Sequence, residues 1–319
     1  MTDHTRQDKL ARIHDIIRTE QSAPPPARAK DMAAAIAKKH PDTVQAFVFY
    51  GSGLREADNL EKMLDYYVLA KRYTDIHGVG LKAFLSFALP PSVHFLEASD
   101  TNGAPMSSKY SIVSYPAFLR RVSGQAREPM IWARFSQPCL IMAYQSEEIK
   151  DALSAGLAQA VLHFAEQVRP LVSGAMTPRA FWARALAESY RTELRAERPL
   201  ERATEIVERY GERYDALAIA IFGPTDPDGF ITIPASKPIK KQACRFKWAT
   251  RRWVGKPATA MRVLKAAFTF DGGLDYVLHK LKSHSGKDIQ VSDAQRRHPI
   301  LWSPIIAWKI WSSGALRHR

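Results

Sequence analysis

The sequence of 319 residues predicts an α+β fold, in which a mixed sheet is followed by a helical region and a basic C-terminal segment. Short runs rich in Val, Ile, Phe and Tyr, bounded by Gly, Pro, Asn and Asp, fill residues 41–147 and are typical of strands. From residue 148 onward, apolar side chains recur at helical spacing instead. Charge marks off a third region, because residues 1–228 carry 28 basic and 28 acidic side chains whereas residues 229–319 carry 18 and 4.

The N-terminal segment, residues 1–40, is expected to be helical. Apolar residues lie at helical spacing between positions 8 and 20, and a second helix is expected over positions 28–39. Three prolines at positions 24–26 separate these helices. Pro41 and Asp42 then mark the start of a domain over residues 41–147.

Strands are expected in that domain in the runs VQAFVFY, MLDYYVLA, LKAFLSFAL, SVHFLEA, YSIVS and PCLIMAY. A helical domain is expected over residues 148–229, with Leu153, Leu157, Val161 and Phe164 on one helix face. A charged helix is expected within it over positions 200–214, and a turn-rich stretch at positions 223–229 closes it. Residues 230–319 form a basic region that holds five of the seven tryptophans.

The composition excludes several classes of protein. Apolar residues make up 46% of the chain and can fill a core, which excludes global disorder. Cys139 and Cys244 are too few for a disulfide framework, and neither they nor the histidines show zinc-ligand spacing. The first residues lack the apolar core of a secretory signal, and no apolar run approaches the roughly 18–20 residues that span a bilayer. A soluble or membrane-surface protein is expected.

The most informative local pattern is a glycine turn between two predicted strands. Gly51-Ser52-Gly53 follows the first strand, and Asp65 lies in the second. Glycine lets backbone N–H groups approach phosphates without a Cβ in the way, and a serine hydroxyl adds a donor. A carboxylate from the next strand can hold Mg²⁺ against those phosphates. This is the layout of nucleotidyltransferases of the DNA polymerase β type, which attack a metal-bound nucleotide at its α-phosphate.

Some residues of this pattern leave alternatives open. The usual second acid, two positions after the first, is replaced by Tyr67, so the second metal ligand is unassigned. Glu97 is a candidate for that role, although a surface salt bridge is the commoner use of such a residue. Taken singly, Lys109 and Arg134 also have the more ordinary interpretation of surface charges.

Five segments follow one another along the chain: Tyr50-Gly51-Ser52-Gly53, Met63-Leu64-Asp65, Lys109-Tyr110-Ser111-Ile112-Val113-Ser114, Ala133-Arg134-Phe135-Ser136-Gln137-Pro138 and Glu188-Ser189-Tyr190-Arg191-Thr192-Glu193-Leu194-Arg195. In order and spacing they resemble the motifs of the mitochondrial-type CDP-diacylglycerol synthases, the peripheral phosphatidate cytidylyltransferases, which also occur in bacteria. The resemblance covers about residues 46–215, and the chain resembles a bacterial member.

The resemblance implies a reaction of CTP with phosphatidate that requires Mg²⁺ and yields CDP-diacylglycerol and pyrophosphate for phospholipid synthesis. It implies a nucleotidyltransferase domain, a winged-helix-like domain and a membrane-contacting C-terminal segment, peripheral to the inner face of the cytoplasmic membrane. Asp65 would ligate Mg²⁺, and Lys109 would neutralise charge on the reacting phosphates. The nucleotide-binding residues would be Gly51, Ser52, Gly53, Tyr110, Arg134, Tyr190 and Arg195, with the two arginines as phosphate clamps.

Two other functions stay open at this point. One is a nucleotidyltransferase that acts on a different lipid phosphate. The other is a non-catalytic membrane- or RNA-binding protein on a degenerate nucleotidyltransferase fold, which Tyr67 at the second acid position favours.

The basic region has its own alternatives. Between positions 229 and 270 it has ten Lys or Arg and no acid, with Trp248 and Trp253 among them. Such a pattern binds nucleic acid or an anionic bilayer, or else consists of core tryptophans beside solvated charges. The apolar run at positions 299–311 favours a bilayer, because nucleic acid rarely contacts so much aliphatic surface. An anionic membrane surface is therefore the expected partner.

Overall fold

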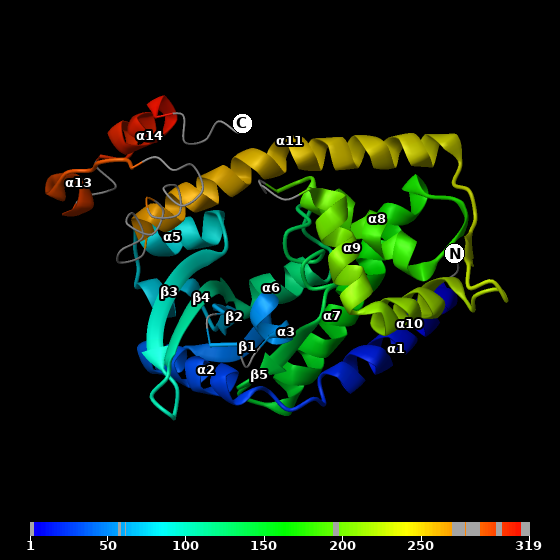
Figure 1. Cartoon of the computed structure of the whole chain (residues 1–319), viewed down its shortest axis with the longest axis horizontal. Helices are drawn as coiled ribbons and strands as arrows, with labels where there is room; N and C mark the ends of the chain where they lie inside the picture. The colour runs from blue at the N-terminus through cyan, green and yellow to red at the C-terminus, as the bar shows by residue number, and fades with distance from the viewer. Residues whose placement is uncertain are drawn as a thin grey trace.

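The computed structural model describes residues 3–56, 59, 60, 62–193, 198–269, 278, 288–297 and 302–313. In this part of the chain a five-stranded mixed sheet is surrounded by helices, as Figure 1 shows. The predicted α+β class is therefore confirmed. None of the helices within these ranges has both the length and the apolar character that crossing a bilayer requires.

The sheet has the strand order β3-β4-β2-β1-β5. Its strands are β1 (Val44–Tyr50), β2 (Leu64–Ala70), β3 (Ser92–Ser99), β4 (Pro105–Ser114) and β5 (Cys139–Met142). Strands β2 and β4 run parallel, and the other neighbours are antiparallel. Five of the predicted runs are thus confirmed as strands.

The sixth run, LKAFLSFAL, is not a strand. It forms helix α5 (Leu81–Ala88), after the short helices α3 (Ser52–Arg55) and α4 (Tyr73–His77). The eight residues of α5 include no β-branched side chain, and Leu, Lys and Ala favour a helix. The sequence prediction was wrong because it weighed apolar content above side-chain shape.

Helices cover both faces of the sheet. Helix α2 (Ala27–Lys39) packs through Met32 and Ile36 against a core that includes Phe49 and Tyr66. Helices α6 (Tyr115–Val122) and α7 (Glu147–Val168) pack on the other face, where Val48 and Tyr67 lie. The alternating side chains of β1 and β2 therefore divide between two cores.

The second core continues from the sheet into a helical region. That region contains α1 (Asp3–Glu20), α8 (Pro178–Tyr190), α9 (Pro199–Arg209) and α10 (Gly211–Phe222), with a short 3₁₀ turn η1 (Arg169–Leu171). A two-stranded ladder of β6 (Gly174–Met176) and β7 (Ile231–Ile233) adjoins it. The ring centroids of Phe164 of α7 and Trp182 of α8 lie 6.3 Å apart. Helix α7 therefore packs against both the sheet and the helical region.

The charged helix predicted over positions 200–214 is two helices, α9 and α10. The break lies at Tyr210, and α10 starts at Gly211, where an added Cβ would lie 2.5 Å from Cζ of Arg179. Because Arg179 also binds Asp215 and Glu208, its position is fixed by ion pairs. The boundary therefore coincides with a glycine, whose helix propensity is low and whose missing side chain leaves room for Arg179.

Helix α11 (Pro238–Thr269) extends along one side of the molecule, from α8 and α9 to α5 and β3 (Figure 1). With 32 residues it is about 48 Å long. Trp248 is buried against α7, since its indole N–H donates to the Gln167 carbonyl at 3.0 Å. Further on, Lys265 Nζ donates to the Leu89 carbonyl at 2.7 Å. Part of the basic region is therefore core.

Two short helices, α13 (Asp293–Arg297) and α14 (Ser303–Ser312), complete the described chain. Ile306 and Ile310 of α14 belong to a small apolar cluster with Ile289 and Val291. On the same helix Trp308 remains exposed. The described part of the predicted apolar run thus forms a helix that buries one side and exposes the other.

Candidate functional site

Two of the predicted site residues, Asp65 and Lys109, lie in one row across the sheet together with Tyr50. Tyr50, the last residue of β1, pairs with Asp65 near the start of β2. Asp65 in turn pairs with Lys109 of the parallel strand β4. Because neighbouring strands lie about 4.8 Å apart, this register places a carboxylate and an amine on adjacent strands.

The row faces one side of the sheet. Asp65 lies on the same face of β2 as Tyr67 and Leu69, and Lys109 lies on the same face of β4 as Val113. Tyr67, Leu69 and Val113 belong to the core beside α6 and α7. Asp65 and Lys109 are both partly exposed, whereas those core residues are buried. The charged end of the row is therefore open to a ligand at the rim of an apolar core.

The glycine turn lies directly against Asp65. Gly51 has φ +85, and a Cβ added there would lie 2.8 Å from Oδ2 of Asp65. At Gly53 a Cβ would lie 3.1 Å from Cδ2 of Leu64. Gly51 thus needs both a left-handed conformation and the absence of a side chain, and Ser52 follows it at the start of α3.

Arg134 joins this row to the end of α8. Its Nη1 donates to the Tyr50 hydroxyl at 3.4 Å, and its Cζ lies 5.6 Å from the centroid of the Tyr50 ring. Its Nη2 lies 3.6 Å from Oε1 of Glu193, and the Arg134 side chain is 24% exposed. The guanidinium is thus held at the site, while part of the Arg134 side chain stays accessible.

A second contact joins the same two segments. The Tyr190 hydroxyl donates to Oε1 of Gln137 at 3.2 Å. Arg213 holds the turn that contains Gln137 in place, because it donates to the Ser136 carbonyl at 2.8 Å and pairs with Glu20 at 2.6 Å. The predicted segments around Arg134 and Tyr190, far apart in sequence, therefore meet.

Tyr67 occupies the position where a second acid was expected. It is fully buried, and its hydroxyl has no hydrogen-bond partner among the residues that the structure describes. Burial raises the pKa of Tyr67 and that of Tyr50, so both phenols stay protonated at neutral pH. Neither can replace a carboxylate. Glu97 is exposed on β3, with β4 between it and Asp65.

The remaining predicted residues lie elsewhere. Tyr110 is on the opposite face of the sheet from Lys109, where it is hydrogen-bonded to His40 at 3.2 Å and stacks on His94. The structure therefore does not bring Tyr110 to the Asp65 row. Arg195 lies outside the described residues.

Tyr50 and Glu193, the contacts of Arg134, had no role in the sequence prediction. Both stand inside the segments that carry the family resemblance, which is the signal that could have identified them. The arrangement offers one hard carboxylate oxygen ligand, an amine, a guanidinium and a close-packed glycine turn. Such a set suits a phosphate-bearing ligand. Within the described ranges, no group of three or more His, Cys, Asp or Glu residues is placed to hold a metal ion.

No protein-family model matches this sequence, and no curated protein matches it significantly. The residues around Asp65 are therefore the basis for assigning a function.

Proposed function

We propose that this chain is a CTP:phosphatidate cytidylyltransferase, a nucleotidyltransferase that makes CDP-diacylglycerol and pyrophosphate at a membrane surface. The observation that carries the proposal is the row of Tyr50, Asp65 and Lys109 beside the Gly51 turn. Together with Arg134, it supplies the acid, the cations and the close backbone approach that a nucleoside triphosphate requires.

Each group has a role that follows from its chemistry. The backbone at Gly51 and the hydroxyl of Ser52 contact the β- and γ-phosphates. Lys109 neutralises charge that develops on the departing pyrophosphate, and the exposed part of Arg134 binds a phosphate of CTP or of the lipid. Tyr190 positions the ribose or base through the Gln137 turn that it contacts.

Asp65 is the residue that would hold Mg²⁺. Its carboxylate lies against a turn that admits no Cβ, so a phosphate bound by the turn adjoins Oδ2. When bound there, Mg²⁺ neutralises phosphate charge and makes the α-phosphorus more electrophilic. Since Mg²⁺ is commonly held by one or two carboxylates and the substrate phosphates, a single Asp65 fits this use.

The reaction balances without a protein base. An ionised oxygen of the phosphatidate phosphate attacks the α-phosphorus of CTP, and a new P–O bond forms as the bond to the β-phosphate breaks. Pyrophosphate leaves with the electron pair of that bond. The nucleophile is already anionic near pH 7, so the site needs positioning and cations rather than a proton acceptor.

Exposed aromatic and basic residues support the membrane part of the proposal. Trp253 of α11 is 83% exposed and Trp308 of α14 is 63% exposed. Tryptophan favours the headgroup level of a bilayer, and nearby Lys and Arg are attracted to anionic lipid. We place the protein at the inner face of the cytoplasmic membrane, where phosphatidate would be its substrate.

The test is release of pyrophosphate by the purified protein with Mg²⁺, phosphatidate vesicles and each nucleoside triphosphate in turn. CTP is expected to support turnover, and Asp65→Asn to lower it by about 100-fold or more. Asp75→Asn, at an exposed acid of α4, is the matched control and should keep the native rate. Equal rates for the two variants would refute the role of Asp65, and turnover with another lipid phosphate alone would revise the acceptor.

The second candidate is a non-catalytic membrane- or RNA-binding protein, and the buried, protonated Tyr67 favours it. A site with one carboxylate binds a nucleotide phosphate more readily than it performs two-metal chemistry. This candidate predicts no pyrophosphate with any nucleotide and lipid phosphate, while vesicles or RNA still bind.

A further inference from the structure

A groove of about 860 Å³ lies between α8 and α11, apart from the residues of the Asp65 site. Helix α8 and its C-cap residue line it with Arg184, Glu188 and Arg191, whose spacing of four and three residues places them on one helix face. Helix α11 lines it with several basic and apolar side chains. The volume lies within the range of small-molecule binding sites, about 300–1,000 Å³.

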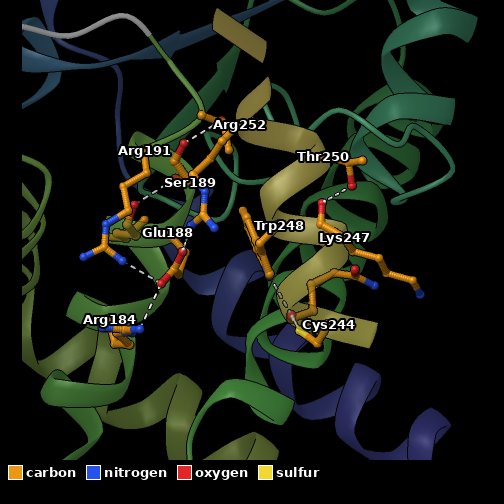
Figure 2. A network of polar contacts seen from close by, with 12 residues as sticks. Arg184, Glu188, Ser189, Arg191, Cys244, Lys247, Trp248, Thr250 and Arg252 are labelled. Atoms are coloured by element: carbon orange, nitrogen blue, oxygen red, sulfur yellow. Dashed lines mark hydrogen bonds and ion pairs between the residues drawn. The ribbon is translucent and has the colours of Figure 1, made fainter. Parts of the chain in front are cut away.

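A buried carboxylate organises the inner part of this groove. Glu188 is 3% exposed, and its Oε1 lies 2.7 Å from Arg191 and 3.0 Å from Arg184. Its Oε2 accepts from Arg252 of α11 at 3.1 Å. Figure 2 shows the three arginine side chains converging on Glu188 from the two helices. The guanidinium groups are therefore held in place before any ligand arrives.

The charges of the groove do not balance. One carboxylate faces three guanidiniums, and Lys241 and Arg245 also line the groove. Neither of these two side chains forms an ion pair or hydrogen bond with any residue in the described part of the chain. Their charge is not needed to hold α8 against α11, since Arg252 already makes that connection. The groove thus presents an excess of positive charge to solvent.

Apolar side chains line the same groove. Leu171, Pro238, Phe246 and Trp248 border the charged group, and Phe246 is largely exposed. A bare inorganic ion would leave this surface in water, whereas a ligand with an apolar part would cover it. Guanidinium groups match phosphate oxygens in pairs, which makes phosphate the anion that best fits the arginines.

We propose that the α8–α11 groove binds a phosphate monoester, with the phosphate beside Arg245, Lys241 and the fixed arginines and the organic part against Phe246. A lipid headgroup and a soluble phosphate ester share this chemistry. The groove is separate from the Asp65 row, because none of its lining residues belongs to that row.

The experiment measures affinity in two arms for the native chain and two charge-reversal variants. The groove variant is Lys241→Glu/Arg245→Glu, and the matched control is Lys240→Glu/Lys247→Glu, which alters two exposed lysines of α11 outside the groove lining. One arm titrates sn-glycerol 3-phosphate by calorimetry. The other measures sedimentation with phosphatidylcholine vesicles that contain phosphatidate. Arg245→Gln is the milder variant if the groove variant does not fold.

We expect the groove variant to bind at least about tenfold more weakly, and the control to stay within about twofold of the native chain. A loss in the calorimetric arm identifies a soluble phosphate ester, and a loss in the vesicle arm alone identifies a lipid headgroup. Equal losses for groove and control variants, or no binding of either probe by the native chain, would overturn the proposal. Pyrophosphate release by the groove variant is measured alongside, so that failure of the groove proposal can be told apart from failure of the proposed activity.

Discussion

Gly51 combines a backbone conformation that favours glycine with a close approach to the carboxylate of Asp65. We predict that Gly51→Ala lowers both the free energy of unfolding and pyrophosphate release, because its Cβ would lie 2.8 Å from Oδ2 of Asp65. The control is Gly103→Ala, at nearly the same φ of +82 but with no atom within 4 Å of the new Cβ. The control should lose only the conformational cost of about 1–2 kcal/mol. Equal losses of activity in the two variants would contradict the close approach to Asp65.

Two buried histidines should make stability fall in weak acid. Burial, with the nearby His77 and His40, lowers the pKa of His94 to about 3, and burial lowers the pKa of His163 to about 4. Between these values and the unfolded pKa of about 6.5, the unfolded chain binds protons that the folded chain does not. Stability is therefore lost as pH falls from about 6.5 toward 4, at up to about 1.4 kcal/mol per pH unit for each histidine.

Urea unfolding at pH 7, 6 and 5 checks this prediction. His94→Phe keeps a ring beside Tyr110 but cannot titrate, so its free energy of unfolding should vary less with pH than that of the native chain. Identical pH profiles for the two proteins would contradict the buried, uncharged state of His94.

At the residue scale, the sequence predicts the strands that carry the site, and strand alternation then predicts which face of the sheet each side chain points to. The runs around Asp65 and Lys109 predicted strands, and alternation already implies that Lys109 and its neighbour Tyr110 point to opposite faces. The assignment of Tyr110 to the nucleotide set overlooked that rule. The contacts of Arg134 with Tyr50 and Glu193 could not be predicted, because they depend on how the end of α8 packs beside the sheet.

At the scale of elements, α11 is attached to the sheet side by a buried lysine. Lys265 Nζ donates to the carbonyls of Leu89 and Pro91 at 2.7 and 2.9 Å. We predict that Lys265→Met lowers the free energy of unfolding by about 1–3 kcal/mol, because two carbonyls lose their donor. Lys256→Met, at an exposed position of the same helix, should have little effect. Equal melting temperatures for the two variants would show that this attachment does not stabilise the fold.

Element boundaries show what sequence patterns leave out. The predicted helices over positions 8–20 and 28–39 correspond to α1 and α2, where amphipathic spacing agrees with the packing. The α9–α10 boundary lies at Tyr210 and Gly211, and the prediction of one helix overlooked the low helix propensity of glycine. The run that forms α5 was misassigned since short apolar runs fit a helix and a strand equally well.

At the scale of the whole molecule, the positive charge of the C-terminal third has two uses. Some cations are internal: the Arg251 guanidinium lies 5.2 Å from the Trp132 ring centroid and 4.8 Å from that of Trp248. Others, beside the exposed Trp253 and Trp308, face solvent. The net charge of +14 therefore overstates the charge that is available to a partner.

This division leads to a prediction for membrane binding. Trp253→Ser/Trp308→Ser should weaken binding to vesicles that contain phosphatidate or cardiolipin by about tenfold or more, because both indoles are exposed and tryptophan favours the headgroup level of a bilayer. Leu200→Ser, at an exposed apolar residue of α9, is the control and should bind as the native chain does. Raising the salt from 0.1 to 0.5 M should weaken the remaining binding of the tryptophan variant, since its attraction is then mainly electrostatic. Sedimentation of the tryptophan variant equal to that of the control would assign vesicle binding to another surface of the molecule.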